Sequence, residues 1–145
     1  MADVGYLAKL YRNTGTYDAP TWEEIDLVRD VTVTLSADEV DLTTRASGGF
    51  KQAGAGLKEL TFEFEARWKG DDTNLAALRD AYLNGTSVEL LALDGPVTTP
   101  GSQGPRATCV ITKFDRSEPL ADAITVSITA KPTPSEHNPE WFTAS

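Results

Sequence analysis

"RASGGFKQAGAGLKELTFEFEARW", residues 45–68, joins a loose, glycine-rich stretch directly to the most regular pattern in the chain. From residue 59 onward polar and apolar side chains alternate, which is the period of a strand with one buried and one solvent-facing side. The apolar set is Leu60, Phe62, Phe64, Ala66 and Trp68, and the polar set is Glu59, Thr61, Glu63, Glu65 and Arg67. The pattern predicts a strand whose three glutamates share one face.

Most of the remaining chain also has the composition of strands, and no internal repeat is visible. The predicted strands are 6–12, 22–35, 87–94, 106–117 and 122–131. Within 22–35 the apolar residues Ile25, Leu27 and Val28 do not keep one period, which indicates either a bulge or a break between two short strands. The C-terminal segment 132–145 is rich in proline and has no apolar period.

One helix is expected at about residues 73–84. The polar run 71–73 offers N-terminal caps, and Asn84–Gly85 is a typical stop signal. Leu75, Leu78 and Tyr82 are spaced to form one apolar stripe. A helix of this length is marginal in water on its own, so we expect it to pack on the sheet.

The totals are those of one globular domain. The chain has 145 residues, of which 40% are hydrophobic and 24% charged. No window approaches the roughly 20 apolar residues of a membrane span. Residues 1–11 lack the basic and apolar regions of a secretory signal, so we expect the protein to be made in a cytoplasm.

The net charge is −9 and is unevenly spread. Between residues 18 and 41 there are eight acids and one base, Arg29. A protein that grips DNA phosphates needs a basic surface, so this balance argues against such a role. The acids either keep the protein soluble or form a surface that must not adhere to a polyanion.

No pattern in the sequence is typical of a catalytic or metal site. Gly54-Ala55-Gly56 precedes a strand rather than the helix that a phosphate-binding loop requires. Glu23 and Glu24 are neighbours on a predicted strand and point to opposite faces, whereas Asp71–Asp72 reads as a helix cap. Glu63 and Glu65 share a face about 7 Å apart, but solvated glutamates on sheets are common.

The single cysteine and the single histidine add no chemistry that spacing can support. Cys109 excludes an internal disulfide, and its apolar strand predicts an inert buried thiol. His137 reads as a solvent-exposed residue of the C-terminal segment. Asn84-Gly85-Thr86 matches a glycosylation acceptor but reads as the end of the helix. We therefore expect no catalytic residues, no metal and no cofactor.

The order and spacing of these features resemble the major tail tube proteins of long-tailed bacteriophages, whose fold is shared with type VI secretion tube proteins. The resemblance covers residues 22–95 closely and extends to the last two predicted strands. It rests on Trp22 and Ile25, Asp41-Leu42-Thr43, the Gly56–Leu57 step, and the charged turn and helix "WKGDDTNLAALRDAYLNGT", residues 68–86.

The resemblance implies a β-sandwich or barrel-like body, residues 1–131, flanked by one helix and followed by an extended tail, 132–145. It implies hexameric rings that stack into a tube through which DNA passes without specific binding. Residues 44–57 would be a mobile assembly arm, with Arg45, Phe50, Lys51 and Leu57 as its contact residues. Ordering such an arm costs about 1–2 kcal/mol per residue of backbone entropy, which contacts between subunits must offset.

The same resemblance implies a virion protein in the phage tail. Its partners would be copies of itself and other tail proteins, such as the tape measure and the terminator, and no membrane. Candidate lumen acids are Glu59, Glu63 and Glu65, or alternatively the acids of 23–30. Lys51, Lys58 and Arg67 lie near the same segment and weaken a purely acidic lumen.

A second hypothesis is a carbohydrate-binding or adhesin-like β-sandwich module. Trp22, Trp68 and Trp141 would be its stacking platforms. Against it, Trp68 belongs to the apolar set with Phe62 and Phe64, which favours a place in the core. An enzyme is the least supported alternative because no convergent set of reactive groups is present.

Overall fold

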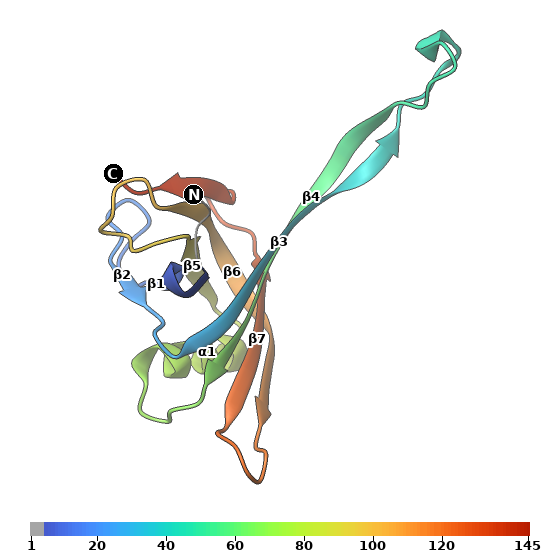
Figure 1. Cartoon of the computed structure of the whole chain (residues 1–145). Helices are drawn as coiled ribbons and strands as arrows, with labels where there is room; N and C mark the ends of the chain where they lie inside the picture. Colours follow the sequence, from blue (N-terminus) through green and yellow to red (C-terminus); the bar gives the residue numbers. More distant parts are fainter. Residues whose placement is uncertain (1–4) are drawn as a thin grey trace.

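A computed structural model describes residues 5–145, so the first four residues of the predicted body lie outside it. Eight strands and one helix follow one another along the chain (Figure 1). They are β1 (Lys9–Asn13), β2 (Trp22–Glu24), β3 (Val28–Asp41), β4 (Ala53–Arg67), α1 (Thr73–Asn84), β5 (Ser87–Leu93), β6 (Gln103–Ser117), β7 (Thr125–Pro132) and β8 (Glu140–Thr143). The predicted class, mostly β with one flanking helix, is confirmed.

The strands form one antiparallel sheet in the order β2-β1-β5-β6-β7-β4-β3, and β8 pairs with β6. The sheet curls around its core, and α1 packs against β5 and β6 (Figure 1). Because β2 and β3 end the order, each has one side that pairs with no other strand in the described chain. The sheet thus encloses its core and leaves unpaired the outer sides of β2, of β3 and of the short strand β8 within the described chain.

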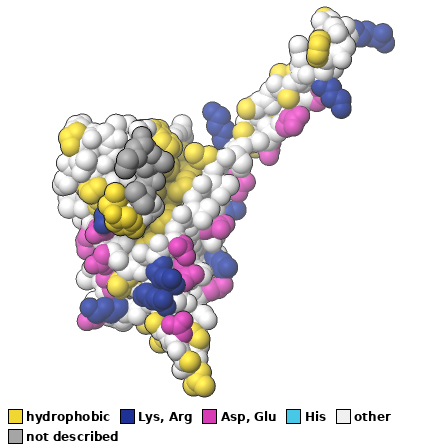
Figure 2. Space-filling model, viewed as in Figure 1, with side chains coloured by type: hydrophobic (Ala, Val, Ile, Leu, Met, Phe, Trp, Pro, Cys, Tyr) yellow, Lys and Arg dark blue, Asp and Glu magenta, His cyan; other side chains and the backbone are white. Residues whose placement is uncertain are grey.

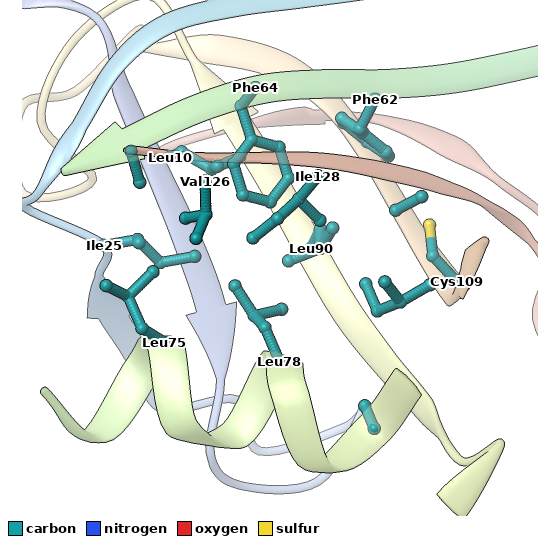
Figure 3. Close-up of a cluster of buried hydrophobic side chains, with 14 of the residues drawn as sticks. Leu10, Ile25, Phe62, Phe64, Leu75, Leu78, Leu90, Cys109, Val126 and Ile128 are labelled. Carbon is teal, nitrogen blue, oxygen red and sulfur yellow. The ribbon is translucent and has the colours of Figure 1, made fainter. Parts of the chain in front are cut away.

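The core lies between the helix and the apolar face of the central strands (Figure 3). Leu75 and Leu78 of α1 are fully buried and point toward Phe64 of β4 and Ile128 of β7. The alternation that starts at Leu60 is confirmed, because every second residue from Leu60 to Ala66 is buried. The polar face of β4 therefore lies on the side of the sheet away from α1.

Helix α1 begins and ends where the sequence predicts. The Asp72 side chain accepts the backbone N–H of Leu75 at 2.9 Å, and Gly85 adopts the left-handed conformation, φ 66°. One member of the predicted stripe is wrong: Tyr82 is 47% exposed. Ala81 is buried in its place, since a small side chain suffices where the helix end approaches the sheet.

Several predicted strand boundaries differ from the structure. β6 begins at Gln103 rather than at residue 106, and β7 begins at Thr125 rather than at residue 122. The first strand begins at Lys9 rather than Tyr6, because Gly5–Leu7 form a 3₁₀ turn in which the Ala8 N–H bonds the Gly5 carbonyl at 3.1 Å. The irregular segment 22–35 is a break between two strands. It occurs at Ile25, whose side chain is buried and whose N–H bonds the Leu10 carbonyl at 2.9 Å.

The long strands β3 and β4 form a hairpin that projects far beyond the body (Figure 1). β4 changes environment within three residues, since Leu57 is 83% exposed and Leu60 is 4% exposed. At about 3.3 Å per residue, the part of the hairpin before Leu60 reaches roughly 20 Å from the body. Strand pairing continues to Ala53, so β4 belongs half to the body and half to the projection.

Candidate assembly surfaces

The end of the projecting hairpin is a hydrogen-bonded turn. Thr44 precedes a 3₁₀ turn at Arg45–Ser47, and its N–H bonds the Ser47 hydroxyl at 2.9 Å. Across the turn, the Gln52 N–H bonds the Thr43 hydroxyl at 2.8 Å. At its start, the Asp41 carboxylate accepts the Thr43 N–H at 2.9 Å, and this backbone bond lowers the pKa of Asp41. The turn has a defined local shape although it touches no part of the body.

Two glycines of the quoted stretch are explained by cross-strand neighbours. A Cβ on Gly54 would lie 2.7 Å from the Leu42 side chain, and one on Gly56 would lie 3.1 Å from that of Val40. Gly54 is paired with Val40 of β3, and Gly56 lies at the register shift between the Ala37 and Glu39 pairs. The predicted loop "QAGAG" is therefore a strand from Ala53 onward, and its glycines leave room for the larger side chains of the partner strand.

The four arm residues named from the sequence lie on this hairpin. Phe50 is 76% exposed at the turn, and Arg45, Lys51 and Leu57 are also exposed. Phe50 has no apolar shelter, although a side chain of this kind normally contributes about 1.5–3 kcal/mol when buried. Such a tip is typical of a surface that becomes covered by another molecule. The role of these residues in assembly stays a prediction.

The glutamate row of β4 lies on the polar face of the sheet. Glu59 accepts from the Lys131 ammonium at 3.1 Å, and Glu65 lies 3.5 Å from the guanidinium of Arg29. Glu63 has no ion pair within the described residues and is flanked by Thr32 and Thr129 of the neighbouring strands. The buried Thr61 separates Glu59 from Glu63, so the carboxylates form two exposed parts of one face, and Glu63 has no compensating cation in the described chain. Whether it faces a lumen stays a prediction.

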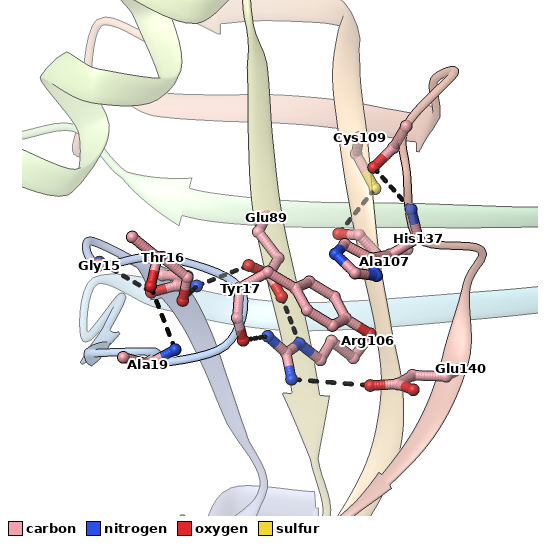
Figure 4. Close-up of polar contacts among 12 residues, drawn as sticks. Gly15, Thr16, Tyr17, Ala19, Glu89, Arg106, Ala107, Cys109, His137 and Glu140 are labelled. Atoms are coloured by element: carbon pink, nitrogen blue, oxygen red, sulfur yellow. Dashed lines mark hydrogen bonds and ion pairs between the residues drawn. The ribbon is translucent and has the colours of Figure 1, made fainter.

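A buried arginine that the sequence does not single out fastens the C-terminal segment to the body (Figure 4). Arg106 of β6 pairs with Glu89 and lies 3.6 Å from Glu140, and it donates to the Tyr17 carbonyl at 2.7 Å. Its guanidinium also covers the Tyr17 ring at 3.9 Å. These partners come from three distant segments, so no local pattern could have predicted the cluster.

His137 belongs to the same region, and the prediction that it is solvent-exposed is wrong. Its ring stacks on the Tyr17 ring, with centroids 3.5 Å apart. Arg106 contacts both Tyr17 and Glu140, and so holds the loop of Tyr17 beside the C-terminal segment. Burial of Tyr17, more than its carboxylate neighbour Glu140, raises the pKa of its hydroxyl. These contacts give the ring pair a role in holding the loop against the tail segment.

Residues 5–145 contain few groups that could react or bind a metal ion. Cys109 is buried, as predicted, and burial raises the pKa of its thiol to about 12. Within residues 5–145 no three His, Cys, Asp or Glu side chains are grouped to hold a metal ion. No helix in that range is long and apolar enough to cross a membrane.

The three tryptophans do not form a common platform. Phe142 meets the Trp22 ring edge-on at 6.0 Å, so the adjacent side chain of Trp141 projects from the other side of β8. Trp68 packs on the core and meets Phe114 edge-on at 6.2 Å, as its apolar neighbours predict. This dispersal gives no support to the carbohydrate-binding hypothesis.

A projecting hairpin with an exposed aromatic tip and unpaired sheet edges is typical of a subunit that associates with other chains. The model of the phage tail tube protein family matches residues 9–133, and the chain belongs to that family. This confirms the resemblance drawn from the sequence, and the family is structural rather than enzymatic. A comparison with curated proteins finds no match.

Solved structures share the fold. A chain of the tail of an empty gene transfer agent particle, determined with C6 symmetry, has a TM-score of 0.72 and 18% identity over 92% of this chain and 96% of that one. The SPP1 tail tube has a TM-score of 0.72 and 16% identity, over 90% and 75%. A chain of the PVC sheath–tube complex, an extracellular contractile injection system, has a TM-score of 0.66 and 11% identity, over 98% and 92%.

Proposed function

We propose that the protein forms hexameric rings that stack into a hollow tail tube, and that DNA passes through this tube during ejection. The observation that carries the proposal is the exposed, hydrogen-bonded hairpin of β3 and β4, whose projecting part pairs with no other strand among residues 5–145. An isolated subunit gains nothing from holding Phe50 in water. The C6 symmetry in the description of the gene transfer agent tail supports six subunits per ring.

The unpaired edges at the two ends of the strand order suggest how a ring would close. β2 and β3 each present unpaired backbone groups, and exposed edges pair readily with another chain. If the β3 edge of one subunit met an edge strand of the next, the sheet would continue around the ring. The polar face of β4 would then line one side of that sheet, and the face that carries α1 would form the other.

A lumen lined by the polar face would repel phosphate. The face carries Glu59, Glu63 and Glu65, and the whole chain has a net charge of −9. A negatively charged wall lowers the local concentration of DNA at the surface and lets it slide without binding. In this proposal the body is residues 1–131, the arm is 44–57, and the tail segment is 132–145.

The proposal also places the protein in the virion tail, after synthesis in the host cytoplasm. A tube of fixed length requires other proteins within it and at its end, which we expect to be tape measure and terminator proteins. These contacts would involve the rim and lumen of the assembled rings rather than a pocket of one subunit.

Electron microscopy of the purified chain tests the proposal. Concentrated protein should form rings or tubes, and class averages viewed along the tube axis should show sixfold symmetry. Double-stranded DNA should not be retained by these tubes at low salt. A protein that stays monomeric in solution, as measured by light scattering over the accessible concentration range, would contradict the proposal.

A further inference from the structure

Positive charge is concentrated on the arm and the residues next to it. Residues 42–58 contain three cations, Arg45, Lys51 and Lys58, and no acid, although the whole chain is strongly acidic. Figure 2 shows Lys and Arg side chains at the far end of the hairpin and Asp and Glu side chains nearer its base. A surface with this polarity is suited to meet an acidic patch on another molecule.

Ion pairing follows the same division. Each of the ten other Lys and Arg side chains of the described chain lies within 3.9 Å of a carboxylate oxygen. Arg45, Lys51 and Lys58 are the described cations with no carboxylate partner at that distance. Every cation of the body thus has a carboxylate partner, and the body has acids in excess. The arm and the adjacent Lys58 carry cations with no acid nearby in the same segment.

A cleft in the body could receive such a tip, because both acidic and apolar side chains line it. It has a volume of about 520 Å³ and lies between β3, the start of β1 and the region where β6 meets β8. Apolar side chains line it, among them Ile25, Val31 and Trp141. Figure 2 shows hydrophobic side chains gathered in the angle between the body and the base of the hairpin. Its volume is within the range of about 300–1,000 Å³ that is typical of ligand sites.

The charges of the cleft leave two carboxylates available. Its cations are already occupied, since Lys9 lies 3.0 Å from Glu24 and Arg29 lies 3.5 Å from Glu65. Asp26 and Asp94 line the cleft without a cation partner in the described chain. Asp94 accepts the backbone N–H of Gln103 at 2.9 Å, which orients its carboxylate.

We infer that the arm tip of a second copy of the chain occupies this cleft, with Phe50 against its apolar lining and Arg45 and Lys51 against Asp26 and Asp94. The inference rests on the proposed assembly and names the receiving surface. A subunit cannot fill its own cleft, because β3 forms one wall at Val28–Val33 and then leads away (Figure 1). Ten residues lie between Val33 and Thr44, so the two are about 35 Å apart along an extended strand.

A charge-swap experiment tests the pairing. The arm variant is R45E/K51E, the cleft variant is D26K/D94K, and the swap combines all four changes and restores the parent net charge. The readout is the protein concentration above which tubes appear in pelleting assays and electron micrographs. We expect the arm variant and the cleft variant each to raise this concentration about tenfold or more, and the swap to recover most of that loss.

Matched controls separate pairing from net charge. K69E/R79E makes the same charge change as the arm variant at exposed body cations, and it should assemble like the parent. D71K/D80K combined with the arm variant restores the net charge away from the cleft and should not rescue assembly. Thermal melts establish that each variant is folded. If loss of the Asp94–Gln103 bond unfolds the cleft variant, D26K alone replaces it, with partial rescue expected.

Several results would overturn the inference while leaving the proposed function intact. If the parent and the arm variant formed tubes equally well, the tip charges would not be used in assembly. Equal rescue by D71K/D80K would show a net-charge effect. Absence of tubes from the parent chain would instead contradict the proposed function.

Discussion

Gly104 occupies the point where β6 passes closest to β5. A Cβ at this residue would lie 1.6 Å from the carbonyl oxygen of Ala92, a separation that no side-chain rotation can relieve. Glycine is therefore required here by the close approach of two backbones. The contact also fixes the start of β6, where β8 pairs.

We predict that Gly104→Ala lowers the free energy of unfolding by about 1–3 kcal/mol or more, because β5 and β6 must separate. Urea denaturation followed by circular dichroism measures the change. Gly70→Ala is the matched control, since a Cβ there meets nothing within 4 Å and the residue has no positive φ. A Gly104→Ala protein as stable as Gly70→Ala would show that the strands tolerate the methyl group.

Arg106 is the second residue whose environment decides stability. Its side chain and that of Glu89 are 7% and 10% exposed, and Glu89 also accepts from the Asn13 amide at 2.6 Å. Removing one member of a buried pair leaves an uncompensated charge. The same change releases the contact with Glu140, and with it the anchoring of β8.

Arg106→Met should therefore cost about 3–5 kcal/mol of folding free energy in denaturation measurements. Lys113→Met, which breaks the exposed pair with Asp115, should cost less than about 1 kcal/mol. Adding Glu89→Gln to Arg106→Met should recover part of the loss, since the buried charge is then absent. If the single and double variants were equally unstable, lost packing rather than lost charge would explain the effect.

The roles of some residues could be predicted from their sequence neighbours, and the roles of others could not. The Asp72 cap, the Gly85 terminator and the buried Cys109 depend on neighbours within a few positions, so their sequence contexts predict them. Arg106 depends on residues 17, 89 and 140, which only the folded chain brings together. A lone arginine in a strand pattern carries no signal that distinguishes a buried pair from a solvated one.

At the scale of elements, the β3–β4 hairpin combines a rigid base with an exposed end. Side-chain alternation predicts β4 from residue 59 onward, because each residue there has a side chain that is either buried or solvated. The same strand is not evident between Ala53 and Leu57, since glycine has no side chain to alternate. The neighbouring side chains of Val40 and Leu42 account for those glycines, but these contacts cannot be predicted from the sequence.

Deleting residues 46–55 tests the role of this element. The deleted segment contributes no buried side chain, so we expect a cooperative thermal melt within a few degrees of the parent. We expect the same protein to form no tubes, because the tip contacts are absent. Light scattering and electron microscopy measure assembly. Normal tubes from the deleted protein would contradict the assignment of 44–57 as an assembly arm.

At the scale of the whole molecule, the sheet has two faces with different chemistry. One face packs on α1 and buries Phe62 and Phe64, and the opposite face of β4 carries the glutamate row. The sequence predicts that these glutamates share a face but does not predict the strand order, which depends on contacts between distant segments. The cleft likewise could not be predicted from the sequence, since β1, β3, β5 and β6 all contribute to its walls.

The two faces make the proposed lumen testable by charge reversal. We expect the variant E59K/E63K/E65K, once assembled, to retain double-stranded DNA at low salt, because lysines would replace carboxylates along the lumen. Retention should fall steeply as salt rises, since each lysine–phosphate contact releases counterions. The exposed pairs Glu59–Lys131 and Glu65–Arg29 contribute about 0–1 kcal/mol each, so the subunit should stay folded.

A matched variant distinguishes the inside of the tube from the outside. D71K/D80K/E118K makes the same charge change at exposed acids, two of them beside or on α1, and should coat the outer surface of tubes with short DNA. Electron micrographs separate coated tubes from filled ones. If the glutamate variant also gave coated tubes, the polar face of β4 would lie outside. Assembled tubes of that variant with no DNA affinity at low salt would place the row in contacts between subunits. We expect filled tubes, because the proposed lumen places the face opposite α1 toward the axis of the ring.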